Sequence, residues 1–146
     1  YIYFECLVLI FVMSTTSVLV NAVPARISYN ASVTKQVVTK KSIIEITVDQ
    51  TKFGPNEIHV YVLNKNGTPK QVGVGINTLQ EKIAVLSWSN PDAKIDKLPV
   101  DLRFLGLNHF ISTNSFIPSP GNWELQVRIN IDDFNSEYAS IKINFN

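Results

Sequence analysis

Residues 123–131 read WELQVRINI, and apolar and polar side chains alternate along the whole stretch. A period of two places every second side chain on the same face of a β-strand. The apolar set consists of Trp123, Leu125, Val127, Ile129 and Ile131. The stretch therefore predicts a strand with one buried and one solvated face. Turn-forming residues bound it on both sides, with Pro118-Ser119-Pro120-Gly121 before it and Asp132-Asp133-Phe134-Asn135-Ser136 after it.

The same period recurs through most of the chain that precedes and follows this stretch. Alternating sets predict strands at residues 44–48, 58–62, 72–76, 98–104 and 139–145, and an apolar run occupies residues 83–88. A hairpin is expected at Asn64–Pro69, because Asn and Gly tolerate positive φ and Pro cannot donate to a ladder. No helical period follows residue 26. Residues 42–146 are thus predicted to form an all-β, immunoglobulin-like antiparallel sandwich of seven to eight strands, with residues 27–41 as a linker or first edge strand.

The first 26 residues have a different character. Between Glu5 and Arg26 the sequence has no charged residue, and Pro24 closes the apolar run. A helix from Tyr1 to Val23 would span roughly 34 Å, and the hydrocarbon core of a bilayer is about 30 Å thick. Residues 1–26 are therefore predicted to be a transmembrane α-helix. The competing interpretation is a cleaved signal peptide, but neither an initial Met nor a basic residue precedes the apolar run.

Composition narrows the classes of partner. The net charge is +1, and charges of both signs are spread along the chain, so nucleic acid is not expected as a partner. The single cysteine, Cys6, lies in the predicted helix, so the sandwich should be held by its core without a disulfide. No nucleophile elbow, zinc-protease motif or phosphate-binding loop is present, and an enzyme is not expected.

Two other features have a structural interpretation and a functional one. The acidic residues Asp132, Asp133 and Glu137 could hold calcium, although a solvated turn is the simpler interpretation. Trp88 and Trp123 could form a sugar-binding platform if exposed. Trp123 shares its face with aliphatic residues, which favours core packing.

The order of these parts resembles the C-terminal end of copper resistance D (CopD) membrane proteins, including the fused CopC-CopD type. The similarity covers a helix with Glu5 near its start that runs into Pro24-Ala25-Arg26, and then the Gly54-Pro55-Asn56 segment. It continues with the Asn64–Pro69 turn and with Pro120-Gly121-Asn122-Trp123-Glu124-Leu125-Gln126-Val127. The segment from Leu86 to Lys97 lacks the Met-rich or Gly-rich stretches that members often carry.

The resemblance implies that this chain is the C-terminal part of a copper resistance or copper transport protein of the cell membrane. Residues 1–26 would then be the last of several transmembrane helices, residue 1 would not be the true start, and residues 27–146 would be extracytoplasmic. The implied partners are the lipid bilayer, upstream transmembrane helices of the same protein and a periplasmic copper-binding protein. The implied cofactor is a copper ion in the full-length protein.

The candidate metal ligands are Glu5, Cys6, Met13, His59 and His109. Copper(I) prefers sulfur and imidazole, and copper(II) prefers imidazole with carboxylate or amine. Cys6 and Met13 fall on nearly the same face of the predicted helix, where they could line a path or simply be apolar filler. Glu5 could mark an ion path or lie at the headgroups.

His59 and His109 are each interpreted as a surface or edge histidine rather than a ligand, because no converging ligands are evident in the sequence. The β-domain is therefore predicted to bind copper weakly or not at all and to act as an accessory or docking module. The alternative hypothesis is a single-span, membrane-anchored β-sandwich that serves as a binding or adhesion module.

Overall fold

The computed structural model describes residues 32–77 and 82–146. This part of the chain contains nine β-strands: β1 (Val33–Val38), β2 (Ile43–Asp49), β3 (Gly54–Leu63), β4 (Ala84–Asn90), β5 (Ile95–Val100), β6 (Arg103–Gly106), β7 (His109–Ile117), β8 (Gly121–Asn130) and β9 (Ser136–Phe145). None of the described residues belongs to a helix long and apolar enough to cross a membrane. The transmembrane helix predicted at residues 1–26 lies outside the described residues.

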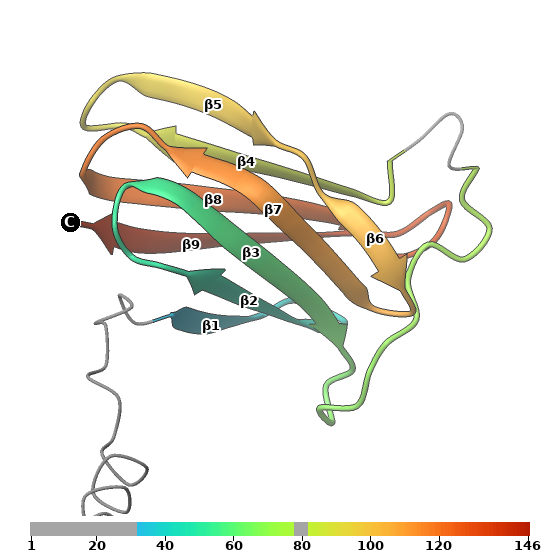
Figure 1. Ribbon diagram of the computed structural model, residues 1–146. Coiled ribbons are helices and arrows are strands. Elements are labelled where there is room, and N and C mark those ends of the chain that lie inside the picture. Colours follow the sequence, from blue (N-terminus) through green and yellow to red (C-terminus); the bar gives the residue numbers. More distant parts are fainter. Residues whose placement is uncertain (1–31, 78–81) are drawn as a thin grey trace, which may run out of the picture.

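The strands form two antiparallel sheets that face each other (Figure 1). One sheet has the order β1-β2-β3-β7-β6 and the other has the order β5-β4-β8-β9. Their inner faces meet in one core, because alternate residues of each strand are buried, as in Ile44-Ile46-Val48 of β2 and Leu125-Val127-Ile129 of β8. The predicted all-β antiparallel sandwich is confirmed, with nine strands in the described residues where seven or eight were expected.

The strand predicted at residues 98–104 is wrong as a single element. The chain leaves the four-stranded sheet after Val100 and enters the five-stranded sheet at Arg103. The alternation continues through this crossing because Val100, Leu102 and Phe104 all pack against the core. An apolar face therefore persists although the hydrogen-bond partners change from β4 to β7.

The strand predicted at residues 72–76 is also wrong. Val72 is buried, and its N–H donates to the carbonyl of Leu107, but Val74 is 54% exposed and forms only an isolated bridge with Asp132. Gly73 and Gly75 have φ angles of 76° and 78°. Positive φ is incompatible with an extended strand, so the two glycines interrupt the ladder that the valine spacing suggested.

Different loops lie at the two ends of the sandwich (Figure 1). We call the end where β1 begins the proximal end; the β2–β3, β4–β5 and β7–β8 connections and the C-terminal residue also lie there. The opposite, distal end carries the β1–β2, β3–β4, β6–β7 and β8–β9 connections. β1 is an edge strand of the five-stranded sheet, and its first residue, Val33, is paired with Val48 near the proximal end.

Candidate metal centre

Histidine and carboxylate side chains gather on the outer face of the five-stranded sheet. Asp49 ends β2, Glu57 and His59 lie on β3, and His109 begins β7, next to β3 in the sheet. Glu57 and His59 alternate with Ile58 and Val60, which are fully buried. Because the core takes the aliphatic set, the period of two directs the polar set outward.

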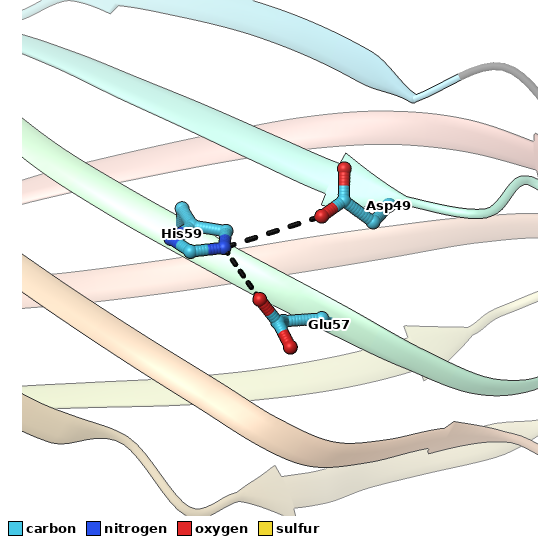
Figure 2. A group of neighbouring side chains, drawn as sticks. All are labelled: Asp49, Glu57 and His59. Carbon is cyan, nitrogen blue, oxygen red and sulfur yellow. Dashed lines mark hydrogen bonds and ion pairs between the residues drawn. The ribbon is translucent and has the colours of Figure 1, made fainter.

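The register brings these residues together. Asp49 is directly opposite Glu57 in the β2–β3 pair. His59 Nε2 lies 2.7 Å from Glu57 Oε1 and 4.0 Å from Asp49 Oδ2 (Figure 2). One ligand atom from each of the three side chains lies within 4.8 Å of the other two.

His109 extends this cluster on the other side of His59. His59 Nδ1 lies 3.1 Å from His109 Nε2. The ring centroids are 5.4 Å apart and the ring planes differ by 17°, so the two imidazoles meet edge to edge in nearly one plane rather than face to face. The two nitrogens therefore share one proton in a hydrogen bond. The ring of Tyr61 stacks on His109 with centroids 4.2 Å apart, which holds the imidazole against the sheet.

The surroundings of His109 favour its neutral form, and the two carboxylates are accessible to solvent. Partial burial lowers the pKa of His109, and the charge of His59 lowers it further. The side chain of His59 is 23% exposed, whereas those of Asp49 and Glu57 are 47% and 41% exposed, so an ion can reach all three. Within residues 32–77 and 82–146, no lysine or arginine forms an ion pair with Asp49 or Glu57.

The donor set indicates which ions would fit. Two carboxylates and one imidazole suit borderline divalent ions such as zinc(II) and copper(II). Copper(I) prefers sulfur ligands, and the single cysteine and single methionine of the sequence are Cys6 and Met13, both before residue 32. The mixture of carboxylate and imidazole ligands in the sandwich thus fits copper(II) better than copper(I).

The structure brings together two of the five ligand candidates from the sequence. No converging ligands for His59 or His109 were evident in the sequence, but in the structure the two histidines contact each other and His59 lies near two carboxylates. Asp49 and Glu57 were missed. The spacing of Glu57 and His59, two residues apart on one strand, was the available signal, because it places both on the same face. Glu5, Cys6 and Met13 lie outside the described residues.

The other features singled out from the sequence do not form sites. Asp132 accepts hydrogen bonds from the backbone of Phe134 and from Asn135, which closes the turn on itself. Glu137 is instead buried and accepts from the backbone N–H of Lys41. Trp88 and Trp123 are 0% and 1% exposed, so the interpretation of either as a sugar-binding platform is wrong.

Comparison with known proteins adds no assignment to this geometry. No protein-family model matches the chain, and no curated protein or solved structure is detectably similar to it.

Proposed function

We propose that this chain is the C-terminal part of a copper resistance or copper transport protein of the cell membrane. In this proposal residues 27–146 are extracytoplasmic, and the sandwich is a non-catalytic accessory domain of immunoglobulin-like type. It docks a periplasmic copper-binding partner through its distal end. The resemblance to copper resistance D membrane proteins supplies the copper context, and the distribution of side chains over the sandwich supplies the docking role.

The strand order supports the immunoglobulin-like assignment. The immunoglobulin constant-type fold has sheets A-B-E-D and C-F-G. The order β2-β3-β7-β6 corresponds to the first and β4-β8-β9 to the second, with β1 and β5 added at one edge of each sheet. Trp88 on β4 takes the place of the buried tryptophan typical of strand C.

The residues that carry the family resemblance have structural roles in this sandwich. Gly54 (φ 112°) begins β3, the central strand of the five-stranded sheet, and Gly121 (φ 129°) begins β8, an inner strand of the other. Gly67 (φ 85°) lies in the turn at the end of β3, where the N–H of Asn64 donates to the carbonyl of Thr68. The shared motifs therefore mark the ends of inner strands, which supports a common domain plan.

The exposed apolar residues at the distal end are the observation that carries the docking role. Phe134 in the β8–β9 turn is 93% exposed, Val74 in the β3–β4 connection 54%, and Leu107 in the β6–β7 turn 53%. Backbone hydrogen bonds tie these connections together, from Val72 N–H to the Leu107 carbonyl and from Gly73 N–H to the Ile131 carbonyl, each 2.9 Å long. These exposed apolar side chains lie on loops that hydrogen bonds hold together, at the end opposite to the start of β1. A surface of this kind is suited to bind a partner away from the membrane.

The same end also favours the second candidate, a single-span anchored binding or adhesion module. In the immunoglobulin nomenclature these are the B–C, D–E and F–G connections, and variable domains bind through B–C and F–G. The two candidates differ in what precedes Tyr1. Several further apolar spans in the upstream coding frame would support the transporter, and a start codon within a few codons would support the single-span module.

The docking role can be tested in cells that produce the full-length protein. Phe134→Ser should change cellular copper accumulation several-fold while the amount of protein in the membrane stays constant. The matched control is Phe53→Ser, because Phe53 is 50% exposed but lies in the β2–β3 connection at the proximal end. Equal copper accumulation in Phe134→Ser, Phe53→Ser and unmodified cells would refute docking through the distal end. Unchanged accumulation after removal of the whole protein would refute the copper role itself.

A further inference from the structure

We infer that Asp49, Glu57 and His59 form a binding site for one borderline divalent metal ion, zinc(II) or copper(II). His109 is the positioning residue that orients His59 toward the ion. Asp49 and Glu57 lie toward the proximal end of the outer face and His59 at the middle of β3, whereas His109 begins β7 beside the β6–β7 turn. The existence of the site does not depend on the proposed function.

The separations of the ligand atoms suit a small ion. Zinc bonds of about 2.0–2.1 Å in a tetrahedron place neighbouring ligand atoms about 3.3 Å apart. The two distances measured from His59 Nε2, 2.7 Å to Glu57 Oε1 and 4.0 Å to Asp49 Oδ2, lie on either side of that value. Rotation of the two carboxylate side chains, which are 47% and 41% exposed, would change both distances toward that value. Solvent would complete the coordination, because all three side chains are partly exposed.

The backbone beneath the site is fixed. Asp49 and Glu57 are register partners in neighbouring strands, and His59 lies two residues after Glu57 on β3. The residues between and beside them, Val48 and Ile58, are 0% exposed and anchor both strands to the core. Ligands that project from packed strands lose little further freedom when an ion binds, which favours affinity.

The hydrogen bond to His109 accommodates the tautomer that a metal requires. His59 Nε2 is the donor in its hydrogen bond to Glu57 Oε1, so an ion bound at Nε2 would take the place of that proton. If His59 Nε2 coordinates the ion, its Nδ1 must carry the remaining proton and donate it outward. His109 Nε2 lies 3.1 Å from Nδ1 and is available as the acceptor. Tyr61, stacked on the face of the His109 ring, keeps that ring in position. A metal-bound histidine normally has such a partner for its second nitrogen, and here the register of β3 and β7 supplies it.

Charge and donor type define the class of ion. The two carboxylates give the site a charge that balances a divalent ion when the histidines are neutral. Calcium and magnesium favour sites made entirely of oxygen ligands, which disfavours them where an imidazole occupies one position. Zinc(II) and copper(II) both accept this mixed set, and the experiment has a separate arm for each.

The experiment is a metal titration of the full chain in detergent, carried out in a Cys6→Ser, Met13→Leu background so that the N-terminal sulfurs do not contribute. After removal of metal with a chelator, zinc(II) and copper(II) are titrated separately by competition with a chromophoric chelator, and calcium and magnesium serve as comparison ions. We expect one equivalent of zinc(II) or copper(II) to bind with a micromolar or lower Kd. His59→Ala should weaken this at least a hundredfold.

Conservative variants separate ligation from folding. Asp49→Asn and Glu57→Gln keep the side-chain shape and should each weaken binding tenfold or more, whereas Glu45→Gln should have no effect. Glu45 is the matched control because it lies on the same outer face of β2 but bonds to Gln36. Each variant without metal should unfold at the same temperature as the parent, and metal should raise that temperature only where it binds.

The role of His109 has its own test. His109→Phe preserves an aromatic ring for Tyr61 but removes the acceptor, and it should weaken binding about ten- to a hundredfold. His109→Gln offers an amide oxygen and should recover part of the loss. For copper(II), the electron paramagnetic resonance spectrum should show coupling to imidazole nitrogen that disappears in His59→Ala. Absence of saturable binding below about 100 µM, or binding that survives both His59→Ala and Glu57→Gln, would overturn the site.

Discussion

Trp88 is the residue whose removal should damage the sandwich most clearly. It lies on β4 with no exposed surface, and its indole N–H donates to Ser115 Oγ at 2.9 Å. Ser115 belongs to β7, so this hydrogen bond joins the two sheets. The indole ring also meets Phe145 of β9 edge to face, with centroids 5.4 Å apart and an interplanar angle of 83°.

The expected magnitude follows from these contacts. Trp88→Ala should lower the free energy of unfolding by about 3–5 kcal/mol, because a large buried aromatic is lost and the site cannot fully collapse. The edge-to-face pair with Phe145 accounts for about 0.5–1.5 kcal/mol of this. Ser115→Ala strands the buried indole N–H and should cost about 1–3 kcal/mol on its own.

Urea unfolding followed by circular dichroism, with residues 27–146 as the parent chain, measures these values. Tyr138→Ala is the control: Tyr138 is 68% exposed on β9, and its loss should change stability by less than about 0.5 kcal/mol. The double variant Trp88→Phe, Ser115→Ala should cost less than the two single changes together, because each removes the same hydrogen bond. If Trp88→Ala were no more destabilising than Tyr138→Ala, the packing of the two sheets described above would be wrong.

Three further predictions concern other parts of the sandwich. Trp123→Ala should cost about 3–5 kcal/mol, and its solvated neighbour Glu124→Ala less than about 1 kcal/mol; similar values in urea unfolding would contradict the alternation of β8. Hydrogen bonds from Asn135 lower the pKa of Asp132, so its stabilising contribution should be present above pH 3.8 and disappear as the pH falls through the folded-state pKa; Asp132→Ala should flatten that limb of a stability–pH curve. A cysteine at exposed Asn66 should react with a membrane-impermeant thiol reagent in intact cells, and labelling only after lysis would contradict an extracytoplasmic domain.

Much of the sandwich could be predicted because one physical requirement, a single buried face, leaves a period of two in the sequence. Along β8 every residue of the predicted apolar set up to Ile129 is buried, and β9 buries Ala139, Ile141, Ile143 and Phe145 in the same way. Turn residues with positive φ, such as Gly67 and Gly121, located the strand ends. These signals are local, so they can be read from the sequence without knowing which strands are neighbours.

The strand predictions fail where the local sequence pattern does not reflect the backbone conformation or the strand pairing. Val72, Val74 and Ile76 have strand spacing, but Gly73 and Gly75 adopt positive φ, and only the backbone reveals that the ladder is broken. The change of sheet between Val100 and Arg103 leaves no trace in the alternation, because both sheets face the same core.

The candidate metal centre could not be predicted for the same reason. His59 and His109 are 50 residues apart, and they meet because β7 follows β3 in the sheet although it is the fourth strand after it in the chain. Asp49 and Glu57 meet across the β2–β3 connection, where the length of the turn sets the register. The spacing of ligands in the sequence shows which side chains share a face of one strand. Which side chains meet across neighbouring strands depends on the register of those strands, and the register cannot be derived from the alternation alone.

The positions of the two proposed surfaces imply that they act independently. β3 runs from the proximal to the distal end, and a ten-residue strand spans about 33 Å. The metal ligands on β3 are its fourth and sixth residues, Glu57 and His59, whereas Phe134 lies in the β8–β9 turn beyond its far end, so no ligand belongs to both surfaces. The positioning residue His109 lies closer to the distal surface, because it begins β7 two residues after Leu107. Because the metal ligands and Phe134 share no contact partner, their contributions to binding should add. An ion on the outer face of the sheet and a protein at the distal end could therefore be bound at once, which is what the proposed accessory role requires.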